Sequence, residues 1–227
     1  DEITSTVLLQ IRPELEKVEL KRAQGKTLEK MDAWDFFQKG RWTIYSSPTG
    51  PVECIKWFEL SEKADGEYID ATAYKLGHAV AANHLLQRSF DLGDDYKKLE
   101  RGRVSDPEND IILMGMGLYN FWDLKQPYEA LSLFKSAIEL NPTNMIAQRL
   151  YAMCLIFTDR PQDALNHFEQ ISTISPKDPE NLRMDVRRAE AYLCLSDFEE
   201  AKRYGELSVS HPINNWPSFT VLISTLG

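Results

Sequence analysis

Residues 128–142 read YEALSLFKSAIELNP, and residues 162–176 read QDALNHFEQISTISP. Alanine, phenylalanine and proline return at matching places in the two stretches: Ala130 and Ala164, Phe134 and Phe168, Pro142 and Pro176. The members of each pair are 34 residues apart. A constant step between three different residue types means that the chain repeats one structural unit, and this period is typical of a helix–turn–helix repeat.

Each repeated position has a physical role in a pair of packed helices. A small residue such as Ala130 lets two helices cross closely, and Phe134, one turn further on, fills the space between neighbouring pairs. Pro142 stops the second helix, because proline cannot continue one. The first helix is expected upstream, and its apolar stripe at three- and four-residue steps is formed by Met114, Gly117, Leu118 and Phe121. The equivalent stripe one repeat later is Tyr151, Ala152 and Leu155.

This pattern resembles the tetratricopeptide-repeat family. The resemblance implies an all-α fold, a superhelix of about five helical hairpins between residues 32 and 212, preceded by an N-terminal helix. A third good copy is marked by Ala189, Tyr192, Phe198 and Ala201. Two degenerate copies are marked by Leu99, Gly102 and Pro107, and by Cys54, Phe58, Ser61 and Gly66. We therefore divide the chain into an N-terminal helix and linker, residues 1–31, and a repeat domain, residues 32–227.

A second resemblance concerns the first forty-odd residues. The segments DEIT (1–4), PEL (13–15), DAWD (32–35) and GRW (40–42) are similar to a bacterial arrangement. In it, a TolB-like domain is followed by C-terminal tetratricopeptide repeats, in proteins related to class III adenylate cyclases and in winged-helix transcriptional regulators. The resemblance implies that this chain is the repeat region of a longer protein, with any catalytic or DNA-binding domain upstream.

Composition narrows the classes of function. A net charge of −9 and a pI near 5.0 argue against binding to nucleic acid, which needs clustered lysine and arginine. No apolar run approaches the roughly 18 residues of a membrane span. The three cysteines, Cys54, Cys154 and Cys194, lie far apart and form no disulfide framework. We expect a cytoplasmic protein, or a periplasmic one if the parent chain has an upstream span.

No motif for chemistry stands out. The four histidines have no metal-site spacing, and free cysteine is usually a small buried hydrophobe. Gly115-Met116-Gly117 is not a phosphate-binding loop, because the full glycine motif is missing, and close helix packing explains these glycines better. We therefore expect no catalytic residue, no metal and no cofactor, so that the chain is not an enzyme. The tryptophans are core candidates, with the exception of Trp122.

In the tetratricopeptide-repeat family, the first helices line the concave side. The positions that correspond to a partner-binding groove are Tyr74, His78, Tyr119, Trp122, Arg149, Met153, Arg187 and Glu190. Aromatic and arginine side chains are typical of binding hot spots. The lysine and asparagine set that clamps a chaperone C-terminus is missing, which disfavours an acidic C-terminal peptide. We expect a non-enzymatic scaffold that binds a peptide, a partner protein or flanking domains of the parent chain. The alternative is a mainly structural or dimerising arm of a cyclase-like or regulator protein.

Overall fold

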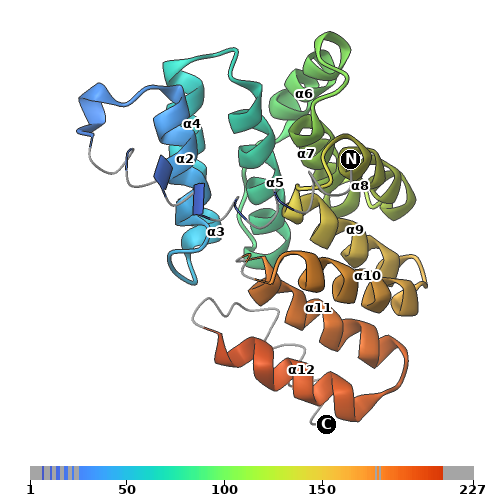
Figure 1. The fold of residues 1–227 in the computed structure, drawn as a ribbon. Coiled ribbons are helices and arrows are strands. Elements are labelled where there is room, and N and C mark those ends of the chain that lie inside the picture. The colour runs from blue at the N-terminus through green and yellow to red at the C-terminus, as the bar shows by residue number, and fades with distance from the viewer. Residues whose placement is uncertain are drawn as a thin grey trace. The chain divides into compact units, whose positions relative to one another are not determined.

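The computed structural model describes residues 26–211 except 177 and 179, together with the separate residues 7, 11, 14, 15, 18, 19 and 22. Within this part of the chain every regular element is a helix, which confirms the expected all-α fold (Figure 1). The helices belong to two compact units, one of residues 14–141 and one described over residues 142–211. The predicted last helix, residues 215–226, and Trp216 lie outside the described residues, as does most of the predicted N-terminal helix.

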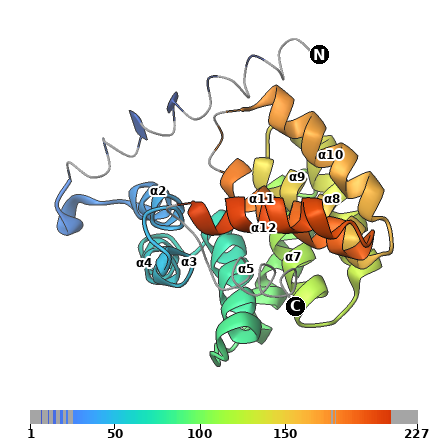
Figure 2. The same ribbon diagram turned by 90° about the horizontal axis from the view of Figure 1, so that it is seen from below.

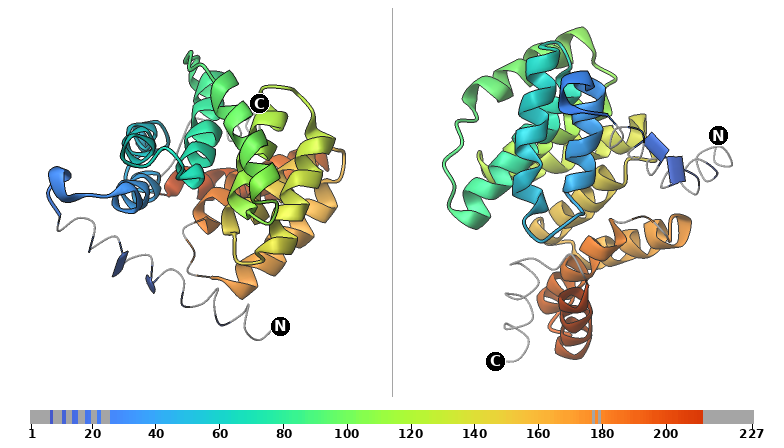
Figure 3. Two further views of the ribbon diagram at one scale, coloured as in Figure 1. Left: turned by 90° about the horizontal axis from the view of Figure 1, so that it is seen from above. Right: turned by 90° about the vertical axis from the view of Figure 1, so that its left-hand side faces the viewer.

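The unit of residues 14–141 contains helices packed in successive antiparallel pairs. They are α2 (Ala33–Thr43) with α4 (Ile55–Ala64), α5 (Ile69–Leu86) with α6 (Gly93–Ser105), and α7 (Asp110–Trp122) with α8 (Pro127–Leu140). The short helices η1 (Leu28–Lys30) and α3 (Gly50–Glu53) lie before and inside the first pair. Figure 2 and the left panel of Figure 3 look along α2 and α4 and show them side by side.

Local sequence explains where these helices begin. The Asp32 carboxylate accepts a hydrogen bond from the backbone N–H of Asp35, and the Asp35 carboxylate accepts one from the N–H of Asp32. This reciprocal capping box satisfies two backbone donors at the start of α2. The Asn109 side chain accepts hydrogen bonds from backbone N–H groups in the first turn of α7. Pro127 begins α8, where its missing N–H costs nothing.

Close contacts fix the helix pairs of the first unit. Ala130 and Phe134 are fully buried, as the repeat pattern predicts. A Cβ atom at Gly117 would lie 2.6 Å from the Phe134 ring, and one at Gly115 would lie 2.9 Å from the Cβ of Ala73. Glycine at these positions lets α7 approach both α8 and α5. The packing interpretation of Gly115 and Gly117 is therefore confirmed.

The unit described over residues 142–211 repeats the arrangement. It pairs α9 (Met145–Phe157) with α10 (Pro161–Ile174) and α11 (Asn181–Cys194) with α12 (Phe198–Ser210). Figure 1 shows α11 and α12 lying side by side. Ala164 and Phe168 are fully buried, like their counterparts 34 residues earlier. The expected succession of helical hairpins is confirmed over the described chain, whereas the boundary expected between residues 31 and 32 stays a prediction.

The core assignment of two tryptophans is wrong. Trp34 and Trp42 in α2 are 42% and 44% exposed. Their neighbours Phe36 and Phe37 are buried instead. One helix can turn only a limited stripe of residues towards its neighbours, and in α2 the phenylalanines occupy that stripe.

Candidate binding surfaces

The C-terminal end of α7 presents an aromatic cluster. The Trp122 indole stacks on the His84 ring of α5, with centroids 5.9 Å apart and planes at 21°. Trp122 is half-buried, and Leu124, two residues on, is 42% exposed. Lys125, with a left-handed φ of 57°, places its Nζ 3.4 Å from Nδ1 of His84. We call His84, Trp122, Leu124 and Lys125 the Trp122 patch.

His84 is uncharged near neutral pH. Partial burial lowers its pKa, and the neighbouring Lys125 ammonium lowers it further, against a weaker opposite effect of Asp123. Since neutral imidazole has one acceptor nitrogen, Nδ1 accepts a hydrogen bond from the Lys125 ammonium. The patch therefore combines an apolar indole with a single positive charge.

The other predicted residues of α5 and α7 face elsewhere. Tyr119 stacks on Tyr96 of α6 at 4.3 Å between centroids. His78 stacks on Phe58 of α4 at 6.2 Å. Tyr74 is 4% exposed and packs edge-on against Phe37 at 5.1 Å. Tyr74 and His78 thus pack towards α2 and α4, whereas Tyr119 lies three residues before Trp122 on α7 and contacts α6.

In the second unit the predicted charged residues are ion-paired within the chain. Arg149 of α9 donates from Nε to Glu180 at 2.5 Å, and their side chains are 12% and 3% exposed. Arg187 donates from Nη1 to both carboxylate oxygens of Glu190, at 2.6 and 2.7 Å. Met153 is 1% exposed. We call Arg149, Glu180, Arg187 and Glu190 the ion-pair strip.

Sequence reasoning missed four of these residues. His84, Leu124 and Lys125 carry no recognisable spacing, and His84 was assigned no role. Glu180 lies 31 residues after Arg149, just before α11 begins. An acidic residue just before a helix is common, so the sequence alone does not indicate that it is buried in an ion pair. The cationic partner of Glu180 comes from another hairpin, and the sequence does not show which residue it is.

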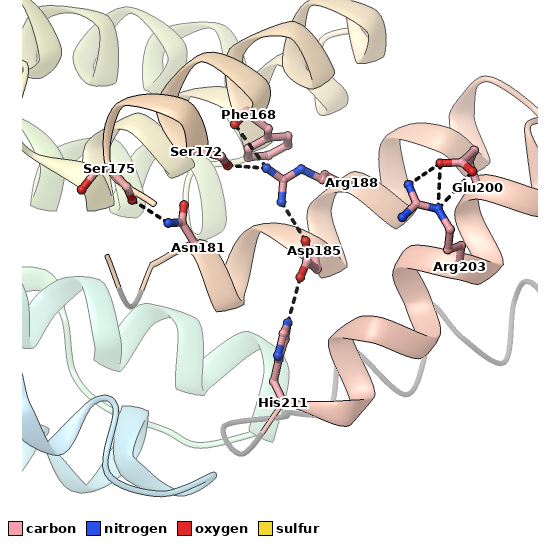
Figure 4. A network of polar contacts seen from close by, with 9 residues as sticks. All are labelled: Phe168, Ser172, Ser175, Asn181, Asp185, Arg188, Glu200, Arg203 and His211. Atoms are coloured by element: carbon pink, nitrogen blue, oxygen red, sulfur yellow. Dashed lines mark hydrogen bonds and ion pairs between the residues drawn. The ribbon is translucent and has the colours of Figure 1, made fainter. Parts of the chain in front are cut away.

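A second polar network joins α10, α11 and the end of α12 (Figure 4). Asp185 is 6% exposed, accepts from Nη1 of Arg188 at 2.7 Å and lies 2.8 Å from Nε2 of His211. Arg188 also donates to the Ser172 hydroxyl at 2.5 Å and to the Phe168 carbonyl at 3.2 Å. Asp185 and Arg188 are each bound to more than one partner in the chain. Its role is to hold the last helix pair on α10.

The cysteines and histidines show no arrangement for chemistry. Among the residues that the structure describes, no three metal-ligating side chains gather. Burial raises the pKa of the Cys154 thiol, which keeps it protonated and weakens it as a nucleophile. Cys54 is likewise buried, whereas Cys194 is exposed. None of the helices in the described ranges has the length and apolar character to cross a membrane.

Comparison with known proteins gives the class. Residues 121–184 match the family model for the tetratricopeptide repeat. A solved structure of the thermophilic TPR protein TTC0263 from Thermus thermophilus is similar, with 13% identity, a TM-score of 0.61, and cover of 86% of this chain and 98% of that one. A second is Cut9–Hcn1, the APC/C hetero-tetramer, with 14% identity, a TM-score of 0.51, and cover of 86% and 43%. No curated protein matches the sequence.

At these identities the likenesses show the fold alone. They agree with the 34-residue step, the helix pairs and the buried alanine and phenylalanine positions. The described chain therefore has a helical-repeat fold similar to those of the solved tetratricopeptide-repeat structures. Residues 121–184, which carry the family match, run from the end of α7 into α11.

Proposed function

We propose that this chain is a non-enzymatic scaffold that holds a peptide or partner protein against the first helices of its hairpins. The observation that carries the proposal is the Trp122 patch. A half-buried indole is stacked on a neighbouring ring beside an exposed leucine. Tryptophan in such a setting offers a large apolar area at little entropic cost, which is why it dominates binding hot spots.

The remaining predicted residues are assigned supporting roles in the proposal. Arg149, Arg187 and Glu190 would contribute polar contacts in the second unit, where each is already held in a defined position by an ion pair. His78 and Tyr119 would border the contact in the first unit. Tyr74 and Met153 are buried, so we propose that they pack beneath the binding surface and do not contact the partner.

The test is Trp122→Ala, measured against peptides selected from a phage-displayed random library on the immobilised wild-type chain. Loss of an aromatic anchor typically costs about 2 kcal/mol or more, so selected peptides should bind roughly thirtyfold more weakly. Trp34→Ala is the matched control, because Trp34 is an exposed indole in α2. It should leave binding unchanged. Selection of no peptide, or equal binding to a Trp122→Ala variant with native circular dichroism, would contradict the proposal.

A second candidate function is a structural or dimerising arm of a cyclase-like or regulator protein. The described helical residues Val7, Ile11, Leu15 and Val18 are between 44% and 61% exposed. Steps of four, four and three residues are the spacing of one helix face, which is the sequence pattern of a dimerising helix. Light scattering of the wild type and of Leu15→Glu checks this: a dimer that Leu15→Glu dissociates supports it, and a monomeric wild type counts against dimerisation. The cytoplasm remains the predicted compartment, and this prediction rests only on the three scattered cysteines, which form no disulfide framework.

A further inference from the structure

The Trp122 patch carries a cation without a carboxylate partner. Among the described residues no carboxylate oxygen lies within ion-pair distance of Lys125, and the polar partner of its ammonium there is Nδ1 of His84. By contrast, Lys75 is held by both Glu62 and Asp95, and Lys98 lies 3.6 Å from Glu62. The exposed ammonium of Lys125 is thus available to a group from outside.

The surroundings of Lys125 favour one kind of partner group. Neutral His84 offers it an acceptor but no negative charge. A cationic residue of a partner would be repelled by Lys125 at this point, whereas a carboxylate would complete an ion pair beside the apolar indole. The exposed Leu124 side chain next to it extends the apolar area. The positive charge of Lys125 and the apolar side chains of Trp122 and Leu124 therefore lie within one small patch.

We propose that the Trp122 patch recognises a segment in which an aspartate or glutamate side chain accompanies a bulky apolar side chain. This inference rests on the proposed function and names the chemistry of the partner at the same site. The apolar side chain packs against Trp122 and Leu124, and the carboxylate pairs with Lys125. The acid is a side chain, so no free C-terminus is required.

The two parts of the patch have unequal effects. An exposed ion pair contributes a factor of about two to five in affinity, much less than an aromatic anchor. Trp122 therefore supplies most of the affinity, and Lys125 selects among apolar segments. The chain's charge of −9 repels acidic segments at long range, and salt screens that repulsion beyond about 8–10 Å. Association should consequently depend weakly on salt, unlike binding to a broad basic surface.

The experiment repeats the phage selection on the wild type, on Lys125→Glu and on Lys135→Glu. Lys135 of α8 is an exposed lysine 3.7 Å from Glu139 and is the matched control. Glutamate at 125 tolerates the left-handed backbone no worse than lysine, since both carry a Cβ atom. The wild type and Lys135→Glu should enrich aspartate or glutamate near an aromatic or aliphatic residue. Lys125→Glu should enrich lysine or arginine there and bind the wild-type peptides about tenfold more weakly.

The outcomes separate this inference from the function on which it rests. Peptides that depend on Trp122 but show no acidic enrichment would overturn the partner class and leave the proposed function in place. The same result follows if Lys125→Glu selects the same residues as the wild type. Peptides that bind without Trp122, or no selected peptides, would remove the proposed site altogether. A free C-terminal carboxylate cannot produce the signal, because the peptides are displayed with their C-termini joined to the coat protein.

Discussion

The two units use the same repeat but hold their helices together differently. Residues 14–141 contain nine of the eleven glycines, and residues 142–211 contain one, Gly205. At Gly115 and Gly117 the first unit brings helices so close that no Cβ atom fits without movement. The second unit buries three acidic side chains, Asp178, Glu180 and Asp185, whereas the first unit buries one, Asp35.

This contrast shows that the same repeat pattern is compatible with different kinds of contact between helices. Two helices approach closely where glycine has no side chain, so this packing is sensitive to added side-chain volume. A buried carboxylate is stabilised by its cationic partner, so a buried ion pair is sensitive to removal of either partner. The first unit should therefore respond most to enlarged side chains, and the second to changes of charge.

The largest effect is expected for Glu180→Ala in the second unit. It leaves the Arg149 guanidinium, 12% exposed, without its carboxylate and should reduce the free energy of unfolding by about 3 kcal/mol or more. Urea unfolding measures the loss, and hydrogen exchange should show it in residues 142–211. Glu139→Ala removes a pair whose side chains are 66% and 64% exposed and should change stability by about 0.5 kcal/mol or less.

A double replacement sharpens this result. Arg149→Met combined with Glu180→Leu removes both charges of this pair. Its stability should return most of the way to that of the wild type, because apolar replacement of a buried pair is often neutral. A double variant as unstable as Glu180→Ala would mean that packing at these positions, rather than the unpaired charge, sets the cost.

The next effect is Gly115→Ala in the first unit. The added Cβ atom would meet the Cβ of Ala73 at 2.9 Å and its backbone at 3.0 Å, and backbone cannot move aside cheaply. Overpacking costs about 1–3 kcal/mol, partly offset by the higher helix propensity of alanine, about 1 kcal/mol. A clear net loss in urea unfolding is expected. At Gly66 no atom lies within 4 Å of an added Cβ, so Gly66→Ala should have little effect.

The smallest effect concerns pH and His167 in the second unit. Burial lowers the pKa of His167, against a weaker opposite effect of the Gln148 backbone, and the Nε2 atom of His167 is buried without a partner. The unfolded chain therefore binds a proton more readily than the folded protein. The contribution of neutral His167 is complete above the ordinary histidine pKa of about 6.5 and is lost as pH falls through the lowered value.

Thermal unfolding of wild type and His167→Gln at pH 8, 6.5 and 5 checks this expectation. The loss of stability on acidification should be smaller in the variant, which cannot titrate at this position. His84→Gln is the matched comparison in the first unit. Its ring is exposed although its pKa is also lowered, so the pH dependence should change less. A larger change for His84 than for His167 would contradict the assignment of burial as the main cause.

The parts of the fold that follow from local pattern were predictable. Ala130, Phe134 and their counterparts one repeat later are buried because a fixed period places them on the same helix face every time. The candidate binding residues were less predictable from the sequence. Tyr74 and Met153 were placed on a groove by the same periodicity, yet both are buried. A first helix in a stack contacts neighbours on several sides, and periodicity alone does not tell a covered flank from an open one.

By itself the sequence determined the repeat, the helix pairs and the positions of their small and aromatic contacts, because these depend on spacing along a single helix or hairpin. Only the tertiary structure decided which side chains pair between helices. Glu180 is the partner of Arg149, His211 lies against Asp185, and His84 supports Trp122. Such pairs join residues 26 to 38 positions apart, and their geometry depends on how the helices of one unit pack together. That packing is set by side chains from different helices, and no local period encodes it.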